Sequence, residues 1–150
     1  MAYGSLFEAI AVRPHLARSL AAHVRDLREE GPVPERTKEL IALMVGWLNA
    51  CDYCTCVHEE IARRLGIEET TLAALGDFAH SAFFNDAERA ALAAAVSLTR
   101  EPRALPPAVW AGLRAQYDEG ACVEIIASIG LNNYLSRLSN ALGVQATQAP

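Results

Sequence analysis

Two cysteines and a histidine stand close together in the segment LNACDYCTCVHEEIARRLG, at Cys51, Cys54 and His58. Because an α-helix turns by about 100° per residue, a helix here would place the three side chains within an arc of roughly 60°. A thiol becomes a strong nucleophile when it ionises, and both an imidazole and the free amide groups of a helix N-terminus favour the thiolate. The pattern therefore indicates a redox-active pair of thiols assisted by a base.

The position of His58 distinguishes the two thiols. In thioredoxin-like CxxC motifs the first cysteine is usually the more acidic one, because it lies nearer the helix N-terminus. Here His58 follows Cys54 by four residues, the spacing at which helical side chains meet, whereas it follows Cys51 by two turns. We therefore expect Cys54 to be the peroxidatic nucleophile and Cys51 the resolving thiol. Oxidation of Cys54 to a sulfenic acid would then lead to a disulfide with Cys51.

A carboxylate reaches this site only if the chain reverses direction. Glu39 lies in PERTKELIALMVGWLNA, which carries no charge after this residue and is expected to form a buried central helix. If the chain turns near Asn49 and Asp52, both suitable helix caps, Glu39 and His58 come level in an antiparallel pair of helices. The sequence therefore predicts that Glu39 lies beside His58.

A buried carboxylate needs a partner, and the sequence offers two. We predict that Glu39 orients His58 and that His58, directly or through a water, takes the proton of Cys54. The alternative is a structural salt bridge between Glu39 and an arginine of the last helix, such as Arg137.

Two other interpretations of the cysteines remain open. Free cysteines are among the most buried residues, so Cys51 and Cys54 would also suit a hydrophobic core. CxxC with a histidine also supplies three zinc ligands, although Cys122 could complete the site only through the fold. We favour redox chemistry and expect no metal. Cys56 falls among polar residues and is predicted to face solvent, and Cys122 is predicted to be a buried structural thiol.

Length and charge exclude several classes of protein. The chain has 150 residues and a net charge of −5, which predicts one domain over residues 1–150 with a hydrophobic core of its own. Its basic residues are scattered, so nucleic-acid binding is not expected. No apolar run approaches the roughly 18–20 residues that span a bilayer, and no basic leader is visible. We expect a cytoplasmic protein that does not bind membranes.

The periodicity of apolar residues predicts an all-α, single-domain helical bundle of about six to eight helices. Asn85 and Glu88 resemble a capping box. Trp47 and Trp110 are expected to anchor the core or an interface. The expected helices cover residues 15–31, 34–50, 51–66, 67–77, 85–100, 109–120 and 122–143.

The order of Glu39, Cys51, Cys54 and His58, with eleven, two and three residues between them, resembles the core motif of AhpD-type alkylhydroperoxidases. These belong to the carboxymuconolactone decarboxylase superfamily. The segments FNDAERAALAAAVSLTREPRALPPAVWAGL and NNYLSRLSNALGV are similar to the C-terminal half of that family. AhpD proper has a further histidine just before the second cysteine, where this chain has Tyr53.

The resemblance implies an AhpD-like, all-helical fold that assembles as a homo-oligomer, either a trimer or a hexamer. It also implies a thiol-dependent peroxidase cycle in which Glu39, Cys51, Cys54 and His58 take the roles argued above, with no metal or bound organic cofactor. The implied partners are a peroxide substrate and an unidentified dithiol or protein reductant. In AhpD a lipoylated acyltransferase recycles the disulfide.

Two further functions remain open. One is the decarboxylase (lyase) activity that names the superfamily, although that reaction needs no dithiol. The other is a redox-sensing or disulfide-exchange module that undergoes little turnover.

Overall fold

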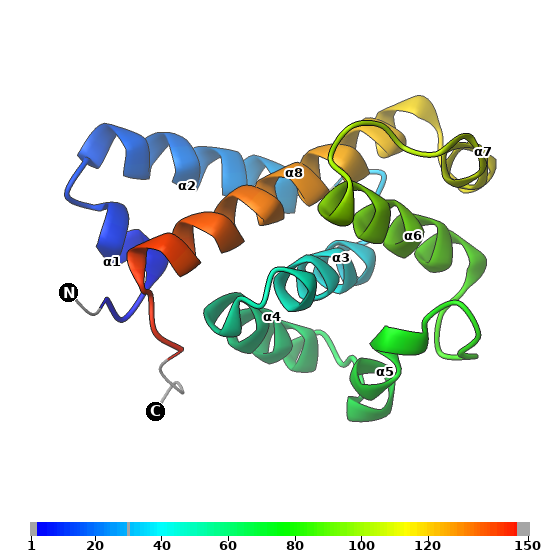
Figure 1. Cartoon of the computed structure of the whole chain (residues 1–150), viewed down its shortest axis with the longest axis horizontal. Coiled ribbons are helices and arrows are strands. Elements are labelled where there is room, and N and C mark those ends of the chain that lie inside the picture. Colours follow the sequence, from blue (N-terminus) through cyan, green and yellow to red (C-terminus); the bar gives the residue numbers. More distant parts are fainter. Residues whose placement is uncertain (1–2, 30, 147–150) are drawn as a thin grey trace.

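The computed structural model describes residues 3–29 and 31–146, and within them the chain is all-α, as predicted (Figure 1). The described residues form eight α-helices and one 3₁₀ turn: α1 Leu6–Ile10, α2 Pro14–Arg28, α3 Glu35–Leu48, α4 Asp52–Arg64, α5 Glu69–Ala73, the 3₁₀ turn Leu75–Asp77, α6 Asp86–Arg100, α7 Pro107–Gln116 and α8 Glu119–Leu142. An isolated parallel bridge joins Tyr3 to Val144. None of the helices in this part of the chain is long and apolar enough to cross a bilayer.

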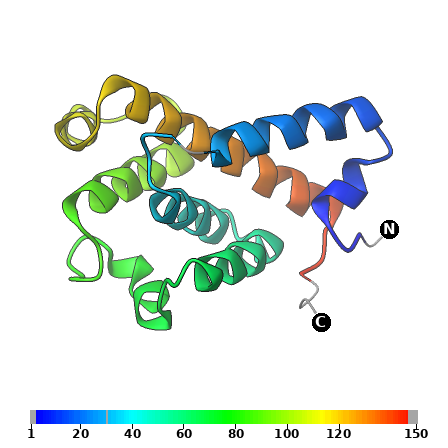
Figure 2. The ribbon, with the colours of Figure 1, turned by 180° about the vertical axis from the view of Figure 1, so that it is seen from behind.

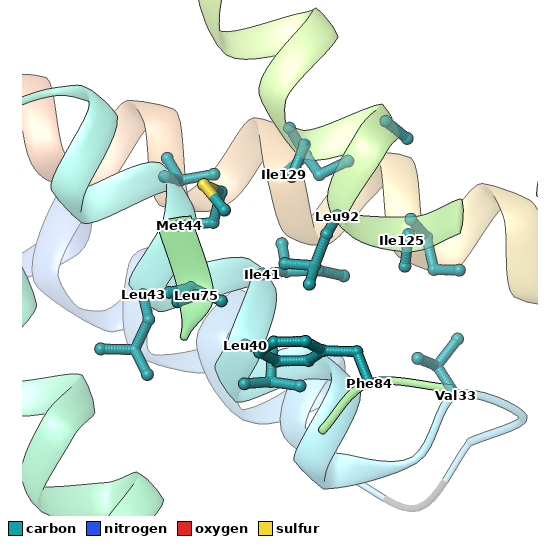
Figure 3. Packing of buried hydrophobic residues seen from close by; sticks show 14 of the residues in the cluster. Val33, Leu40, Ile41, Leu43, Met44, Leu75, Phe84, Leu92, Ile125 and Ile129 are labelled. Carbon is teal, nitrogen blue, oxygen red and sulfur yellow. The ribbon is translucent and has the colours of Figure 1, made fainter. Parts of the chain in front are cut away.

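Helix α3 lies at the centre and packs against α4, α6 and α8 (Figures 1 and 2). Its sequence after Glu39 is uncharged and suits this central position, in which Leu40 and Ile41 are fully buried. Leu92 of α6 and Ile125 of α8 belong to the same core (Figure 3). Full burial of each such side chain stabilises the fold by about 1.5–3 kcal/mol.

The chain reverses between α3 and α4 in a Schellman motif. The amide of Ala50 donates to the carbonyl of Trp47 at 3.1 Å, and the amide of Cys51 donates to the carbonyl of Gly46 at 2.9 Å. Ala50 has a φ of 48°, in the left-handed region that favours glycine. The reversal makes α3 and α4 antiparallel, as predicted, with Asn49 as the cap of α3.

The predicted cap of α4 was wrong by one residue. Cys51, not Asp52, is the N-cap: it has extended backbone angles, and its Sγ accepts a hydrogen bond from the amide of Cys54 at 3.2 Å. Asp52 lies instead in the first turn, where its negative charge suits the helix dipole.

Three other expectations about the helices are resolved. The capping box of Asn85 and Glu88 is confirmed at the start of α6. The expected helix 109–120 was too long, because α7 ends at Gln116 and the side chain of Asp118 caps the start of α8. Helix α1 was not predicted, although Ser5 followed by Glu8 is an N-cap pattern, and the Ser5 side chain does accept from the Glu8 amide.

Candidate active site

Cys51 and Cys54 are joined as a disulfide, with their Cα atoms 5.3 Å apart. The first turn of α4 brings them together, because Cys51 caps the helix and Cys54 lies in that turn. After reduction, the amide of Cys54 that points at the Cys51 sulfur would stabilise a thiolate there, as helix N-termini do for anions. This amide therefore makes Cys51 a good leaving group when the disulfide is reduced.

Glu39 and His58 meet across the antiparallel pair of α3 and α4. His58 Nδ1 lies 2.7 Å from Glu39 Oε2, and the Glu39 side chain is only 3% exposed. Because an ionised carboxylate can only accept, Nδ1 carries the proton and donates it in this hydrogen bond. The Nε2 atom of His58 is thereby left as the nitrogen that can accept a proton.

Arg28 is a second partner of Glu39. At the end of α2, its guanidinium forms an ion pair with Glu39 Oε1, the carboxylate oxygen that His58 does not use. The Arg28 side chain is 42% exposed, so it connects the buried carboxylate to the surface. Burial raises the pKa of Glu39, but the hydrogen bond and charge of His58 and the charge of Arg28 outweigh this effect, and the pKa lies below its ordinary value of 4.5. Glu39 is therefore ionised at neutral pH.

The predicted alternative partner of Glu39 was wrong. Arg137 donates to Asn133, its neighbour on α8. Glu39 does take part in a structural salt bridge, but with Arg28, and this bridge coexists with the bond to His58.

A cavity of about 140 Å³ adjoins these residues. Cys54, His58 and Glu39 line it together with apolar side chains from five helices, α1, α2, α3, α4 and α8. The apolar members of this lining are Leu6, Phe7, Val24, Leu27, Ala42, Val57, Ile61, Leu131 and Leu135. An apolar molecule that enters the cavity is thus brought to a sulfur and an imidazole.

The two sulfurs of the disulfide differ in their surroundings. Cys54 lines the cavity beside His58, whereas Cys51 is 1% exposed and borders a different, open hollow with Trp47 and Cys56. A molecule in the cavity therefore meets Cys54 and not Cys51.

The only lysine of the chain, Lys38, also lines the cavity. Lys38 is buried beside Glu39, forms an ion pair with Glu124 of α8 and donates to the carbonyl of Glu29 at 3.2 Å. These contacts hold the start of α3 against α8 and the end of α2. The charge of Lys38 is thus compensated, as a buried charge requires.

Tyr53 and Arg28 were missed as members of the site by sequence reasoning. The hydroxyl of Tyr53 accepts a hydrogen bond from the amide of Leu6 at 3.2 Å, and Tyr53 lines the cavity. Arg28 lies in the last turn of α2, where an arginine is common because it suits the helix dipole. Its position in the sequence therefore does not indicate a role in the site. Tyr53 departs from the AhpD motif, but this departure by itself does not indicate a contact with α1.

The remaining cysteines and Trp47 do not line the cavity. Cys56 is half-buried, and Cys122 is buried, as predicted for that residue. Burial raises the pKa of the Cys122 thiol, which keeps it protonated and unreactive. Trp47 is 58% exposed, so of its two predicted places, the core or an interface, only the core is wrong. In the described part of the chain no three His, Cys, Asp or Glu side chains form a group that could hold a metal ion.

The chain belongs to the carboxymuconolactone decarboxylase family, whose pattern matches residues 14–97, more than half of its length. It is 29% identical over 119 residues to the uncharacterised protein YdfG of Bacillus subtilis, which covers 79% of this chain and 81% of that protein. The family resemblance drawn from the motif is thereby confirmed.

Two solved structures share the fold. The debrominase Bmp8 has a TM-score of 0.87 and 28% identity, over 95% of this chain and 76% of that chain. A cysteine-to-alanine variant of Bmp8 has also been solved in complex with 2,3,4-tribromopyrrole. A protein of unknown function from Agrobacterium tumefaciens, for which a role as antioxidant defence protein AhpD has been suggested, has a TM-score of 0.86 and 22% identity, over 92% of this chain and 94% of that chain. The AhpD-like fold is confirmed, and the family contains enzymes of different activities.

Proposed function

We propose that this protein is a thiol-dependent peroxidase that reduces organic hydroperoxides or hydrogen peroxide through Cys51 and Cys54. One observation carries the proposal. Cys54 lines a largely apolar cavity together with His58, and His58 Nδ1 is hydrogen-bonded to the buried carboxylate of Glu39. Cys54 also forms a disulfide with Cys51, which does not line this cavity. A nucleophile, a base with an orienting group and a resolving thiol are the parts that such a cycle needs.

The cycle begins with the transfer of the Cys54 proton to His58, which Glu39 holds in place. The thiolate attacks the terminal oxygen of the hydroperoxide, the O–O bond breaks, and the alcohol leaves with the proton from His58. Cys54 is now a sulfenic acid. The thiol of Cys51 attacks this sulfur, water is released, and the disulfide forms. Two electrons have passed from the thiols to the peroxide.

The disulfide must then be reduced by a dithiol or a protein reductant. We further propose that the chain acts in the cytoplasm as a homo-oligomer, either a trimer or a hexamer.

Reductive removal of bromine is a second candidate function. The similarity to the debrominase Bmp8 and the apolar cavity at Cys54 favour it. A thiolate at Cys54 could attack the bromine of a bromopyrrole, the carbon would take up a proton, and Cys51 would displace bromide to form the disulfide. This reaction uses the same two electrons as reduction of a peroxide.

The test begins with the fully reduced protein and one equivalent of tert-butyl hydroperoxide. Intact mass and peptide mapping should show the loss of two hydrogens at Cys51 and Cys54 within minutes. Excess peroxide with dithiothreitol should then give many turnovers. Absence of oxidation would overturn the proposal, and oxidation without turnover would favour a redox sensor.

Two further assays separate the remaining alternatives. Release of bromide from 2,3,4-tribromopyrrole by the reduced protein would favour the debrominase. Loss of carbon dioxide from a carboxylated lactone, unaffected by thiol alkylation, would favour the decarboxylase.

A further inference from the structure

Helix α1 closes one side of the cavity. Leu6 and Phe7 line it; Leu6 is 4% exposed, whereas Phe7 is 42% exposed and therefore lies at the rim. The buried side chains of α1 pack with Leu20 of α2 and with apolar residues of α8. Figures 1 and 2 both show α1 beside the C-terminal end of α8.

Tyr53 connects this wall to the redox motif. It lies between the two cysteines in sequence, and its hydroxyl accepts the amide hydrogen of Leu6, the first residue of α1. The first amides of a helix have no partner within the helix, so this bond satisfies one of them. The ring of Tyr53 also packs with the cluster that contains Leu6 and Ile10.

The wall lies outside the part of the chain that defines the family. The family pattern begins at residue 14, after the end of α1 at Ile10. Tyr53 likewise stands where the AhpD motif has a histidine. The hydroxyl that replaces this imidazole is bound to the backbone of α1, which gives Tyr53 a structural partner.

We propose that α1, fastened by Tyr53, is the outer wall of a size-selective substrate cavity, and that the site takes small apolar hydroperoxides and disfavours bulky ones. This inference rests on the proposed peroxidase function. In it Tyr53 is a positioning residue, and Phe7 determines specificity at the rim.

The volume sets the limit on size. An engineered apolar protein cavity of about 150 Å³ takes up benzene, and the cavity here has about 140 Å³. The part of the organic group that the cavity encloses should therefore be no larger than about a benzene ring. The group of tert-butyl hydroperoxide satisfies this limit, and the phenyl and dimethylmethylene groups of cumene hydroperoxide together exceed it.

The experiment measures the second-order rate constant for oxidation of the reduced full chain by each of these two peroxides. Each constant is divided by that of the same peroxide with dithiothreitol, which removes differences in intrinsic reactivity. We expect the wild type to prefer tert-butyl hydroperoxide by about ten-fold or more, because its organic group has five carbons fewer and a tight apolar pocket can discriminate about ten-fold for a single methylene group. Equal normalised constants would overturn the proposal.

Two variants test the wall itself. Phe7→Ala removes the ring at the rim, and Tyr53→Phe removes only the hydroxyl that binds α1. Each should reduce the preference by about five-fold, chiefly through faster oxidation by cumene hydroperoxide. Phe83→Ala and Tyr134→Phe are matched controls, because both residues are exposed and neither lines the cavity, and their preference should match that of the wild type. If Phe7→Ala and Tyr53→Phe also match the wild type, the wall does not select by size.

A second readout does not depend on peroxidase activity. Cys54 of the reduced protein is alkylated with small iodoacetamide or with bulky monobromobimane, and its modification is followed by peptide mapping. In the wild type Cys54 should react faster with iodoacetamide than with monobromobimane. Phe7→Ala and Tyr53→Phe should bring the ratio of these two rates closer to one. A narrowed ratio with no oxidation by either peroxide would reject the proposed function but keep the wall. An unchanged ratio would reject the wall.

Discussion

His58 Nδ1 lies 2.7 Å from Glu39 Oε2, although the two residues are 19 positions apart in the chain. Arg28 occupies the other oxygen of the same carboxylate. One buried carboxylate therefore orients the imidazole and is itself held by a cation from a third helix. This arrangement fixes the tautomer of His58, which lines the cavity together with Cys54.

Replacement of Glu39 by glutamine should slow the oxidation of Cys54. A glutamine is similar in shape but carries no charge, and its amide can also present a donor to His58, so the imidazole is no longer held in one tautomer. We expect a loss of about 10²-fold in the rate constant with tert-butyl hydroperoxide, the lower end of the range for general acid–base catalysis. This rate constant is measured by intact mass on reactions quenched at successive times.

The matched control for this variant is Glu60→Gln. Glu60 lies on α4 near His58, but it is partly exposed and pairs with Arg64 on the surface. Its replacement should leave the rate within about two-fold, because exposed ion pairs contribute little. A rate for Glu39→Gln within the same margin would show that His58 needs no carboxylate.

The stabilisation that Arg28 provides should depend on pH. The pKa of Glu39 in the folded protein lies below 4.5, so this group stabilises the fold above the unfolded value and loses that effect as the pH falls through the folded pKa. Arg28→Gln should therefore lower the free energy of unfolding most at pH 6–7, and the difference from the wild type should shrink below pH 4.5. Urea unfolding at several pH values measures it.

Arg25→Gln provides the comparison on the same helix. Arg25 is 65% exposed and pairs with Asp26 and Glu29 at the surface. Its replacement should change stability by less than about 0.5 kcal/mol. A constant effect of Arg28→Gln across the pH range would mean that its contribution comes from packing and not from the charge of Glu39.

The order of attack by the two thiols can be tested by trapping. In Cys51→Ser, oxidation should stop at a sulfenic acid on Cys54, which dimedone captures. In Cys54→Ser no sulfenic acid should form, because Cys51 does not line the cavity. Cys56→Ser should form the disulfide as the wild type does. A stable sulfenic acid at Cys51 would reverse the assigned roles.

The turn before Cys51 carries a strained residue. Ala50 has a φ of 48°, and an L-residue in this region costs about 1–2 kcal/mol. Ala50→Gly should therefore raise the free energy of unfolding by about 0.5–1 kcal/mol, part of the gain being offset by the freer unfolded chain.

Gly66 provides the opposite test. It ends α4 in the same type of motif with a φ of 77°, and a Cβ there would meet no atom within 4 Å. Gly66→Ala should therefore lower the free energy of unfolding by about 1 kcal/mol through the backbone alone. Equal signs for Ala50→Gly and Gly66→Ala would contradict the argument from φ.

Local patterns in the sequence were sufficient for most helices. The period of apolar residues located α2, α3, α4, α6 and α8, since a helical stripe must face the core. The pair of Asn85 and Glu88 marked the start of α6 because its hydrogen bonds are local. The cap of α4 was less predictable, because Cys51 replaces the usual oxygen with a sulfur.

The sequence by itself determined that Glu39, Cys54 and His58 could meet, since one reversal between two helices of known period brings them level. Only the tertiary structure decided that Arg28 shares the carboxylate and that α1 covers the cavity. The physical reason is that α1 and α2 are placed by how they pack on each other and on α8, which lies far from them along the chain. The spacing of residues within one helix contains no information about such packing.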